Sequence, residues 1–240
     1  MQTELIICFM DDSPFEHDLV KNEIAPFGKG LKFVQVYNFD EAVKELSGRI
    51  PGIFLLDLWG LDRDCALPCI TPKEELESIA SGINTLDNVY EGLDTFNGDR
   101  TNEYLKRLFS IVDGWRSLFM CACARAGQNN KYGIGNIGRV RKEYPGVPAV
   151  FYTRKSLIND AVAMINAGTE GLYIKPTGKN DHETRILTRE FAPCLIDSLV
   201  KTVRIKIEEI RPHSDYYIHN LGQTDTYLKN LITCWKEFKK

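Results

Sequence analysis

The sequence lacks any apolar run near the ~20 residues that a membrane-spanning helix needs. Its first residues, MQTELIICFMDDSP, have no basic start, and acidic residues follow the apolar stretch at once, so we expect no secretory signal peptide. A basic excess is missing as well, because the formal net charge is −3, and this argues against non-specific nucleic-acid binding. These absences predict a cytoplasmic protein without membrane or nucleic-acid partners.

Recognisable metal-binding spacings of cysteine and histidine are also missing. The seven cysteines are scattered, and those in apolar runs, such as Cys8, indicate buried thiols in a reducing compartment. Cys65, Cys69, Cys121 and Cys123 offer four thiols for zinc, but their spacing is not that of a zinc ribbon or finger. A structural zinc is therefore the less favoured alternative. The four histidines show neither ligand nor triad spacing and are expected at the surface: His17, His182, His213 and His219.

An alternation of strands and helices opens the chain. Hydrophobic residues make up 43% of the sequence, enough to bury a core. Short apolar runs predict strands at residues 5–10, 31–37 and 53–56. A helix with Ser13 as N-cap and Pro14 in its first turn follows the first strand, and Asp40 opens another after the second. This order predicts an α/β protein with a parallel sheet.

The alternation stops after the third strand and resumes later. Residues 60–132 contain no predicted strand, and helical spacing is found at 71–93 and 101–127. Later elements are a helix at 135–146, strands at 147–153 and 170–176 around a helix, a polar loop at 177–188 and a helix at 189–210. We therefore predict one discontinuous α/β domain, residues 1–59 and 133–211, with a helical insertion at 60–132 and a helical tail at 212–240.

Polar residues end four of the five predicted strands. Asp11 and Asp12 follow the first strand, Asp57 the third, Thr153 ends the fourth and Lys175 follows the fifth. Ligands of open parallel sheets bind beyond the carboxyl ends of the strands, where these side chains would meet. Clustered carboxylates repel one another unless a cation such as Mg²⁺ joins them, and an ammonium and a hydroxyl suit a phosphoryl group. The set predicts phosphoryl transfer, with Asp57 as the nucleophile.

Four segments, LIICFMDDSP, IFLLDL, PAVFYT and AGTEGLYIKP, together resemble the receiver (CheY-like) domain of two-component response regulators. The resemblance implies a flavodoxin-like (CheY-like), doubly wound, five-stranded parallel sheet of strand order 2-1-3-4-5. It also implies phosphoryl transfer to an aspartate from a histidine kinase or phosphotransfer protein. The helical insertion and the C-terminal helical extension are additions to that pattern.

The resemblance also implies a role for each residue that ends a strand. Asp57 matches the phosphoacceptor, Thr153 the switch hydroxyl and Lys175 the invariant lysine. Asp11, Asp12 and Asp57 match the carboxylates that hold Mg²⁺. The backbone carbonyl of Trp59, two residues after the acceptor, matches the main-chain metal ligand.

Three positions depart from the family pattern. Trp59 is bulky where the side chain would face the route of the attacking water, and we hypothesise that it slows hydrolysis of the phosphoaspartate. Arg154 stands where the family has a very small residue, so it either crowds the site or adds charge to it. Leu172 occupies the aromatic switch position, and Tyr173 would face the other side of the strand.

Simpler interpretations compete with some of these motifs. Asp11 and Asp12 alone would suit the N-terminus of any helix, because the helix dipole favours acidic residues there. The segment GIGNIG, Gly133 to Gly138, matches G-x-G-x-x-G, but a dinucleotide site needs a strand directly before it, and a loop is predicted there. The basic end, WKEFKK, suits a solvated helix terminus.

The favoured hypothesis is a phosphorylation-dependent signalling switch of the response-regulator type, not an enzyme beyond its own phosphoryl transfer. Its output would run through the inserted or C-terminal helices, by contact with a downstream protein or by homodimerisation. The alternative is a degenerate receiver that binds partners without phosphorylation, motivated by Trp59, Arg154 and Leu172. A Mg²⁺-dependent phosphohydrolase is disfavoured, because such enzymes usually have a second aspartate where this chain has Trp59.

Overall fold

The computed structural model describes residues 5–61, 67–154 and 158–210. The chain divides into two compact units. The core unit comprises the described residues up to Gly60 and those from Asn130 onward, and the inserted unit is Leu61–Asn129. The predicted tail at 212–240 lies outside the described residues.

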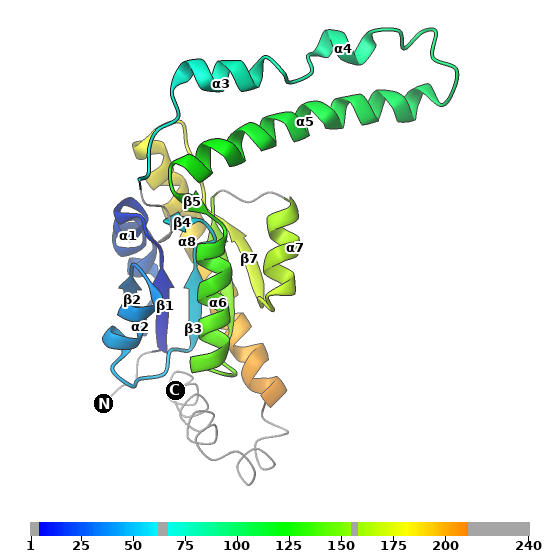
Figure 1. Ribbon diagram of the computed structural model, residues 1–240. Helices are drawn as coiled ribbons and strands as arrows, with labels where there is room; N and C mark the ends of the chain where they lie inside the picture. The colour runs from blue at the N-terminus through cyan, green and yellow to red at the C-terminus, as the bar shows by residue number, and fades with distance from the viewer. Residues whose placement is uncertain (1–4, 62–66, 155–157, 211–240) are drawn as a thin grey trace. The chain divides into compact units, whose positions relative to one another are not determined.

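A five-stranded parallel sheet forms the centre of the core unit (Figure 1). Its strands, in spatial order, are β2 (Leu31–Val36), β1 (Leu5–Met10), β3 (Ile53–Leu56), β6 (Ala149–Thr153) and β7 (Gly171–Ile174). Counted along the chain within this sheet, the order is 2-1-3-4-5, which confirms the predicted flavodoxin-like fold. Met10 of β1 lies opposite Leu56 of β3, so the two central strands end level with each other.

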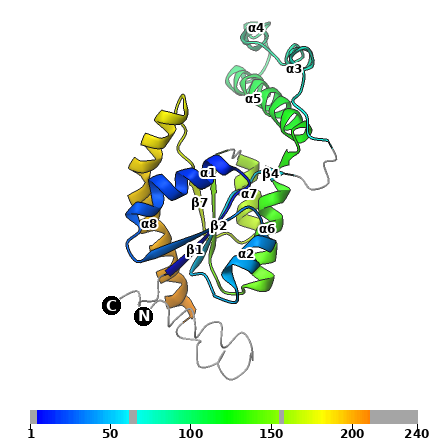
Figure 2. The ribbon, with the colours of Figure 1, turned by 90° about the vertical axis from the view of Figure 1, so that its left-hand side faces the viewer.

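Helices cover both faces of the sheet. One face carries α1 (Pro14–Leu19), the short η1 (Val20–Ile24) and η2 (Ala25–Phe27), and α8 (Asp181–Ile210); the other carries α2 (Phe39–Leu46), α6 (Lys131–Glu143) and α7 (Ile158–Asn166) (Figure 2). Side chains alternate along β1, so that Leu5, Ile7 and Phe9 join the core beneath η1 and α8. None of the described helices is both long and apolar enough to cross a membrane.

Helix α8 begins at Asp181, eight residues before the predicted start, so the polar loop predicted at 177–188 is mostly helical. Asn180 supplies the cap, because its side-chain oxygen accepts from the Glu183 N–H at 2.9 Å. Glu183 in turn accepts from the Lys179 N–H at 2.6 Å. The polar residues at 181–188, which led to the prediction of a loop, form the first turns of this capped helix. Its later turns pack against the core through a row of apolar residues: Ala192, Leu195, Leu199, Val203 and Ile207.

Where the inserted unit is described, it contains three helices, α3 (Lys73–Ala80), α4 (Leu86–Tyr90) and α5 (Arg100–Arg125). The helix predicted at 71–93 is therefore wrong as a continuous element, because Thr85 and Asn88 form a capping box that starts α4 anew. The prediction of no strands is also wrong, since β4 (Gly60–Leu61) and β5 (Gln128–Asn129) pair with each other. Figure 1 shows α3 and α4 along one side of α5.

The cysteines of this unit show no metal site in the part that is described. Cys65 lies outside the described residues. Among the described residues, Cys69, Cys121 and Cys123 form no disulfide, and none of them joins a group of metal-ligating side chains.

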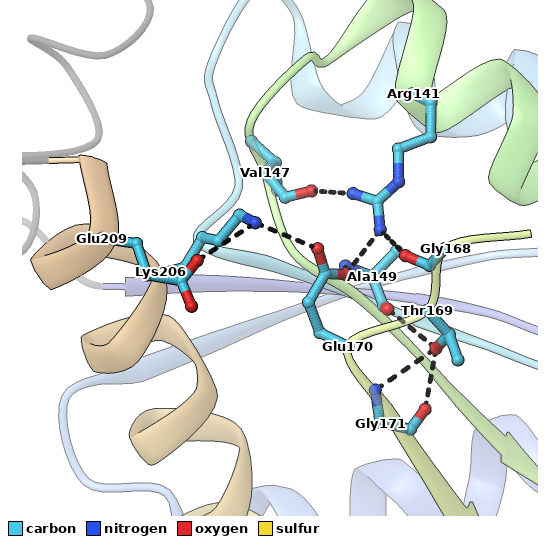
Figure 3. A network of polar contacts seen from close by, with 9 residues as sticks. All are labelled: Arg141, Val147, Ala149, Gly168, Thr169, Glu170, Gly171, Lys206 and Glu209. Atoms are coloured by element: carbon cyan, nitrogen blue, oxygen red, sulfur yellow. Dashed lines mark hydrogen bonds and ion pairs between the residues drawn. The ribbon is translucent and has the colours of Figure 1, made fainter. Parts of the chain in front are cut away.

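A polar network ties α6 and α8 to the starts of β6 and β7 (Figure 3). Glu170 is its centre, because it accepts from the Arg141 guanidinium at 2.6 Å and from the Ala149 N–H at 2.8 Å. Lys206 of α8 lies 3.6 Å from the other carboxylate oxygen. Arg141 also donates to the Val147 carbonyl at 2.8 Å.

Glu170→Ala is expected to lower the free energy of unfolding by about 1.5–3 kcal/mol, because charge-assisted hydrogen bonds lose their acceptor. Glu209→Ala is the matched control, since the ion pair of Glu209 within the described residues is with Lys206, at 3.4 Å on the exposed end of the network. The free energy of unfolding of Glu209→Ala should stay within about 0.5 kcal/mol of the wild-type value. Urea unfolding followed by circular dichroism measures both, and equal losses would contradict the central position given to Glu170.

Candidate functional site

Three carboxylates meet at the carboxyl end of the central strands. Asp11 and Asp12 follow β1, Asp57 follows β3, and the level ends of these strands bring them together. One carboxylate oxygen from each residue lies within 4.8 Å of the others. Asp11 and Asp57 are buried, and Asp12 is half-buried. Below, these three residues are called the acidic cluster.

Lys175 reaches the acidic cluster from the end of β7. Its ammonium pairs with Asp11 and lies 3.1 Å from Asp57 Oδ1. The side chain is only 3% exposed. Burial alone would lower the pKa of Lys175, but the carboxylates around it, Asp57 first, raise it above its usual range. Lys175 is therefore a fixed positive charge next to Asp57.

Glu16 is a fourth carboxylate at this site, and the sequence interpretation missed it. It is buried on α1, with Oε2 3.7 Å from Lys175 Nζ and Oε1 2.8 Å from Arg154 Nη2. Arg154 thus forms an ion pair with Glu16, which accounts for a large basic residue directly after Thr153. The available signal was the position of Glu16 in the first turn of the helix that follows Asp12.

Burial and the closeness of the carboxylates oppose ionisation in the acidic cluster. Burial raises the pKa of Asp11 to about 7, Lys175 opposes this rise, and Asp57 adds to it. Lys175 is shared among three carboxylates, and Arg154 is engaged by Glu16. A hard divalent cation with oxygen ligands fits this donor set, because it would relieve the repulsion that raises the pKa of Asp11.

Thr153 brings a buried hydroxyl to the site. It ends β6, the strand next to β3, and is 2% exposed. Its Oγ1 has no hydrogen-bond partner among the residues that the structure describes. A buried hydroxyl left unsatisfied costs roughly 1–3 kcal/mol. A phosphoryl oxygen on the neighbouring Asp57 would accept from it and remove that cost.

The structure shows where two of the residues that depart from the family pattern lie, Trp59 and Leu172. The indole of Trp59 is among the largest fully buried side chains, so it belongs to the packed interior and does not face open solvent. Tyr173 packs against the core on the α8 side, whereas Leu172 is exposed, as the strand alternation requires.

Helix α6 packs directly on the chain that follows Asp57. The Gly133 N–H donates to the Leu58 carbonyl at 2.9 Å. A Cβ at Gly133 would lie 2.6 Å from both the Asp57 carbonyl oxygen and the Leu58 Cα. Gly135 and Gly138, by contrast, have open space around them, and all three glycines lie within α6. Close helix packing explains the first glycine of GIGNIG, and the motif is not a dinucleotide-binding loop.

Gly133→Ala is expected to destabilise the protein by about 1–3 kcal/mol, because the methyl group meets backbone atoms that cannot rotate away. Gly135→Ala in the same helix should instead stabilise it by about 0.5–1 kcal/mol, since alanine is the better helix former and nothing obstructs its side chain. Thermal unfolding of the two variants provides the comparison. If both substitutions changed the stability in the same direction, the proposed close packing at Gly133 would be ruled out.

Tyr132, the residue before Gly133, lies beside the acidic cluster. A Cβ at Gly60 would lie 2.5 Å from its ring, so the ring rests against the Gly60 backbone. Its hydroxyl donates to the Tyr37 carbonyl at 2.7 Å, beyond the end of β2. Burial first and then the three carboxylates raise the pKa of Tyr132, which keeps the phenol neutral. The start of α6 thus contributes one side of the site.

The chain is similar to several solved structures at low sequence identity. No protein-family model and no curated protein sequence matches the chain. Similar solved structures include a CheY-like receiver domain protein from Methanospirillum hungatei JF-1, with 12% identity, 86% of this chain and 98% of that chain covered, and a TM-score of 0.43. The response regulator domain of Thermotoga maritima CheB has 14% identity, covers 84% and 97% of the two chains, and gives a TM-score of 0.43.

A response regulator protein from Burkholderia pseudomallei with a phosphorylated aspartic acid, calcium ion and citrate has 13% identity, covers 96% and 98%, and gives a TM-score of 0.37. The resemblance to receiver domains holds for the fold, which the strand order of the sheet establishes.

Proposed function

We propose that this protein is a response-regulator-type signalling switch that accepts a phosphoryl group on Asp57 from a histidine kinase or phosphotransfer protein in a Mg²⁺-dependent reaction. The observation that carries the proposal is Lys175. Lys175 follows β7, which is two strands away from β3 in the sheet. Its ammonium nevertheless lies 3.1 Å from Oδ1 of Asp57, the residue that follows β3. The phosphohydrolase alternative has no comparable support, because Trp59 replaces its second aspartate.

The chemistry needs a nucleophile, fixed positive charge and a donor for the transferred group. An Asp57 carboxylate oxygen attacks the phosphorus of a phosphohistidine, the P–N bond breaks, and the imidazole leaves with that bond's electron pair. Lys175 stabilises the charge on the phosphoryl oxygens, and the Thr153 hydroxyl donates to one of them. Asp11, Asp12 and Asp57 would hold Mg²⁺, which neutralises charge on nucleophile and phosphoryl group alike. The Trp59 carbonyl is a further candidate ligand.

The ion pair of Arg154 with Glu16 favours this proposal over the degenerate receiver. An arginine directed into the phosphoryl position would keep Asp57 inaccessible, but its partner at 2.8 Å is Glu16. The degenerate receiver predicts that partner binding is the same with and without a phosphoryl group on Asp57. We further propose that the protein has no enzymatic activity beyond its own phosphoryl transfer and acts through a downstream protein.

Intact-mass spectrometry after incubation with acetyl phosphate tests the function. With Mg²⁺ the chain should gain the mass of one phosphoryl group, and hydroxylamine should remove it, as expected for an acyl phosphate. With EDTA in place of Mg²⁺ the gain should disappear. Absence of label under conditions that fully label a standard receiver would overturn the proposal.

A further inference from the structure

Helix α5 packs against the other described helices of the inserted unit through one of its faces. That face carries Tyr104, Arg107, Ser110 and Gly114, spaced three or four residues apart. The Tyr104 ring lies 5.7 Å from that of Tyr90 of α4. Ser110 accepts from Asn84 at 2.9 Å, and Arg107 donates to the carbonyls at the end of α4. Both smaller helices therefore lie against this face (Figure 1).

The opposite face of α5 carries exposed apolar side chains. Leu105, Phe109 and Val112, here called the α5 stripe, are 46, 67 and 62% exposed. On a helical wheel, these three fall about 180° from the packed face, at the alternating spacing of four and three residues that defines a coiled-coil seam. Large exposed apolar residues that cluster on one face of a helix indicate an interaction surface, whereas single exposed apolar residues are common on protein surfaces.

The charged residues beside the α5 stripe indicate which partner binds it. In a heptad with Phe109 at position a and Val112 at position d, Lys106 and Asp113 both occupy position e. In an antiparallel pair of two such helices, e positions face e positions, and Phe109 of one helix lies in the layer of Val112 of the other. Lys106 then faces Asp113 of the second copy, and the two-fold axis repeats the contact. A parallel pair would place position e against position g, which is held by Thr101, Leu108 and Trp115, and no charges would match.

We propose that α5 pairs antiparallel with α5 of a second copy of this chain, along the α5 stripe and about a two-fold axis between Phe109 and Val112. The pairing buries the three apolar side chains of the stripe and forms two Lys106–Asp113 ion pairs. Asp113 is available for this contact, because its partner within α5, Arg116, is at the long distance of 3.8 Å. The α5 stripe belongs to the inserted unit, and none of its residues is among those proposed for phosphoryl transfer.

Sedimentation equilibrium of the full chain tests the surface. The wild type should form a dimer, and Phe109→Glu should convert it to monomer over the same concentration range. Leu86→Glu is the matched control, because Leu86 is an equally exposed apolar residue of the inserted unit on α4, away from the stripe. It should remain dimeric. A monomeric wild type, or a dimer that survives Phe109→Glu, overturns the proposal.

Charge exchange tests the orientation without removing apolar surface. Lys106→Glu and Asp113→Lys should each weaken dimerisation roughly tenfold or more, because each places two like-charged pairs at the interface. Mixing the two variants should restore a dimer, since the chains then complement each other at both contacts. Circular dichroism establishes that each variant keeps its helices. Folded variants that do not associate on mixing would exclude the antiparallel register.

Discussion

Asp57→Asn is expected to take up no phosphoryl group from acetyl phosphate and Mg²⁺, with label falling below detection. A carboxamide has the shape of the carboxylate but is a poor nucleophile, and it also removes one anionic ligand from the acidic cluster. Asp11 and Asp12 stay in place in this variant, so the loss reports on the acceptor itself. The measurement is the intact mass, read at equal folded protein concentration.

Asp40→Asn is the matched control for this substitution. Asp40 lies in the first turn of α2, and its carboxylate is exposed and pairs with Arg139 at 2.5 Å. The same chemical change there should leave labelling intact. If Asp57→Asn were labelled as fully as the wild type, another residue would be the acceptor and the site assignment would be wrong.

Lys175→Met is expected to lower the free energy of unfolding by about 3–5 kcal/mol in EDTA. The substitution leaves buried carboxylates without the cation that Asp11, Asp57 and Glu16 now share, and an uncompensated buried charge carries a penalty of that size. Mg²⁺ should restore part of the loss, since a ligand that binds only the folded state stabilises it. Urea unfolding with and without Mg²⁺ provides the measurement.

Two further variants separate charge from packing in that result. Lys73→Met removes an exposed lysine that pairs with Glu77 at 3.3 Å, and its cost should stay near 0.5 kcal/mol. Adding Asp57→Asn to Lys175→Met should recover stability, because one of the repelling carboxylates becomes neutral. A Lys175→Met protein as stable as the wild type in EDTA would mean that the cluster is neutralised in another way.

The sequence was sufficient where a local pattern decides the structure. The strand Ile53–Leu56 is an unbroken apolar run, which only a strand buried on both faces accommodates, and the structure has it at the predicted residues. Other element boundaries depended on side-chain caps. The polar segment from Lys179 to Glu183 has the composition of a loop, and only its reciprocal hydrogen bonds make it the start of α8.

The sequence by itself determined the parallel sheet and the residues at its carboxyl edge, because strand ends follow from apolar periodicity and parallel strands end on the same side. Only the tertiary structure decided which charges meet there. Glu16 and Arg154 lie far apart in the chain and become partners because α1 and β6 place them 2.8 Å apart. The tertiary structure also decided that position 133 needs glycine, because backbone atoms after β3 lie too close for a side chain. It likewise decided which apolar residues of α5 are exposed, because that depends on which side of the helix its neighbours pack against.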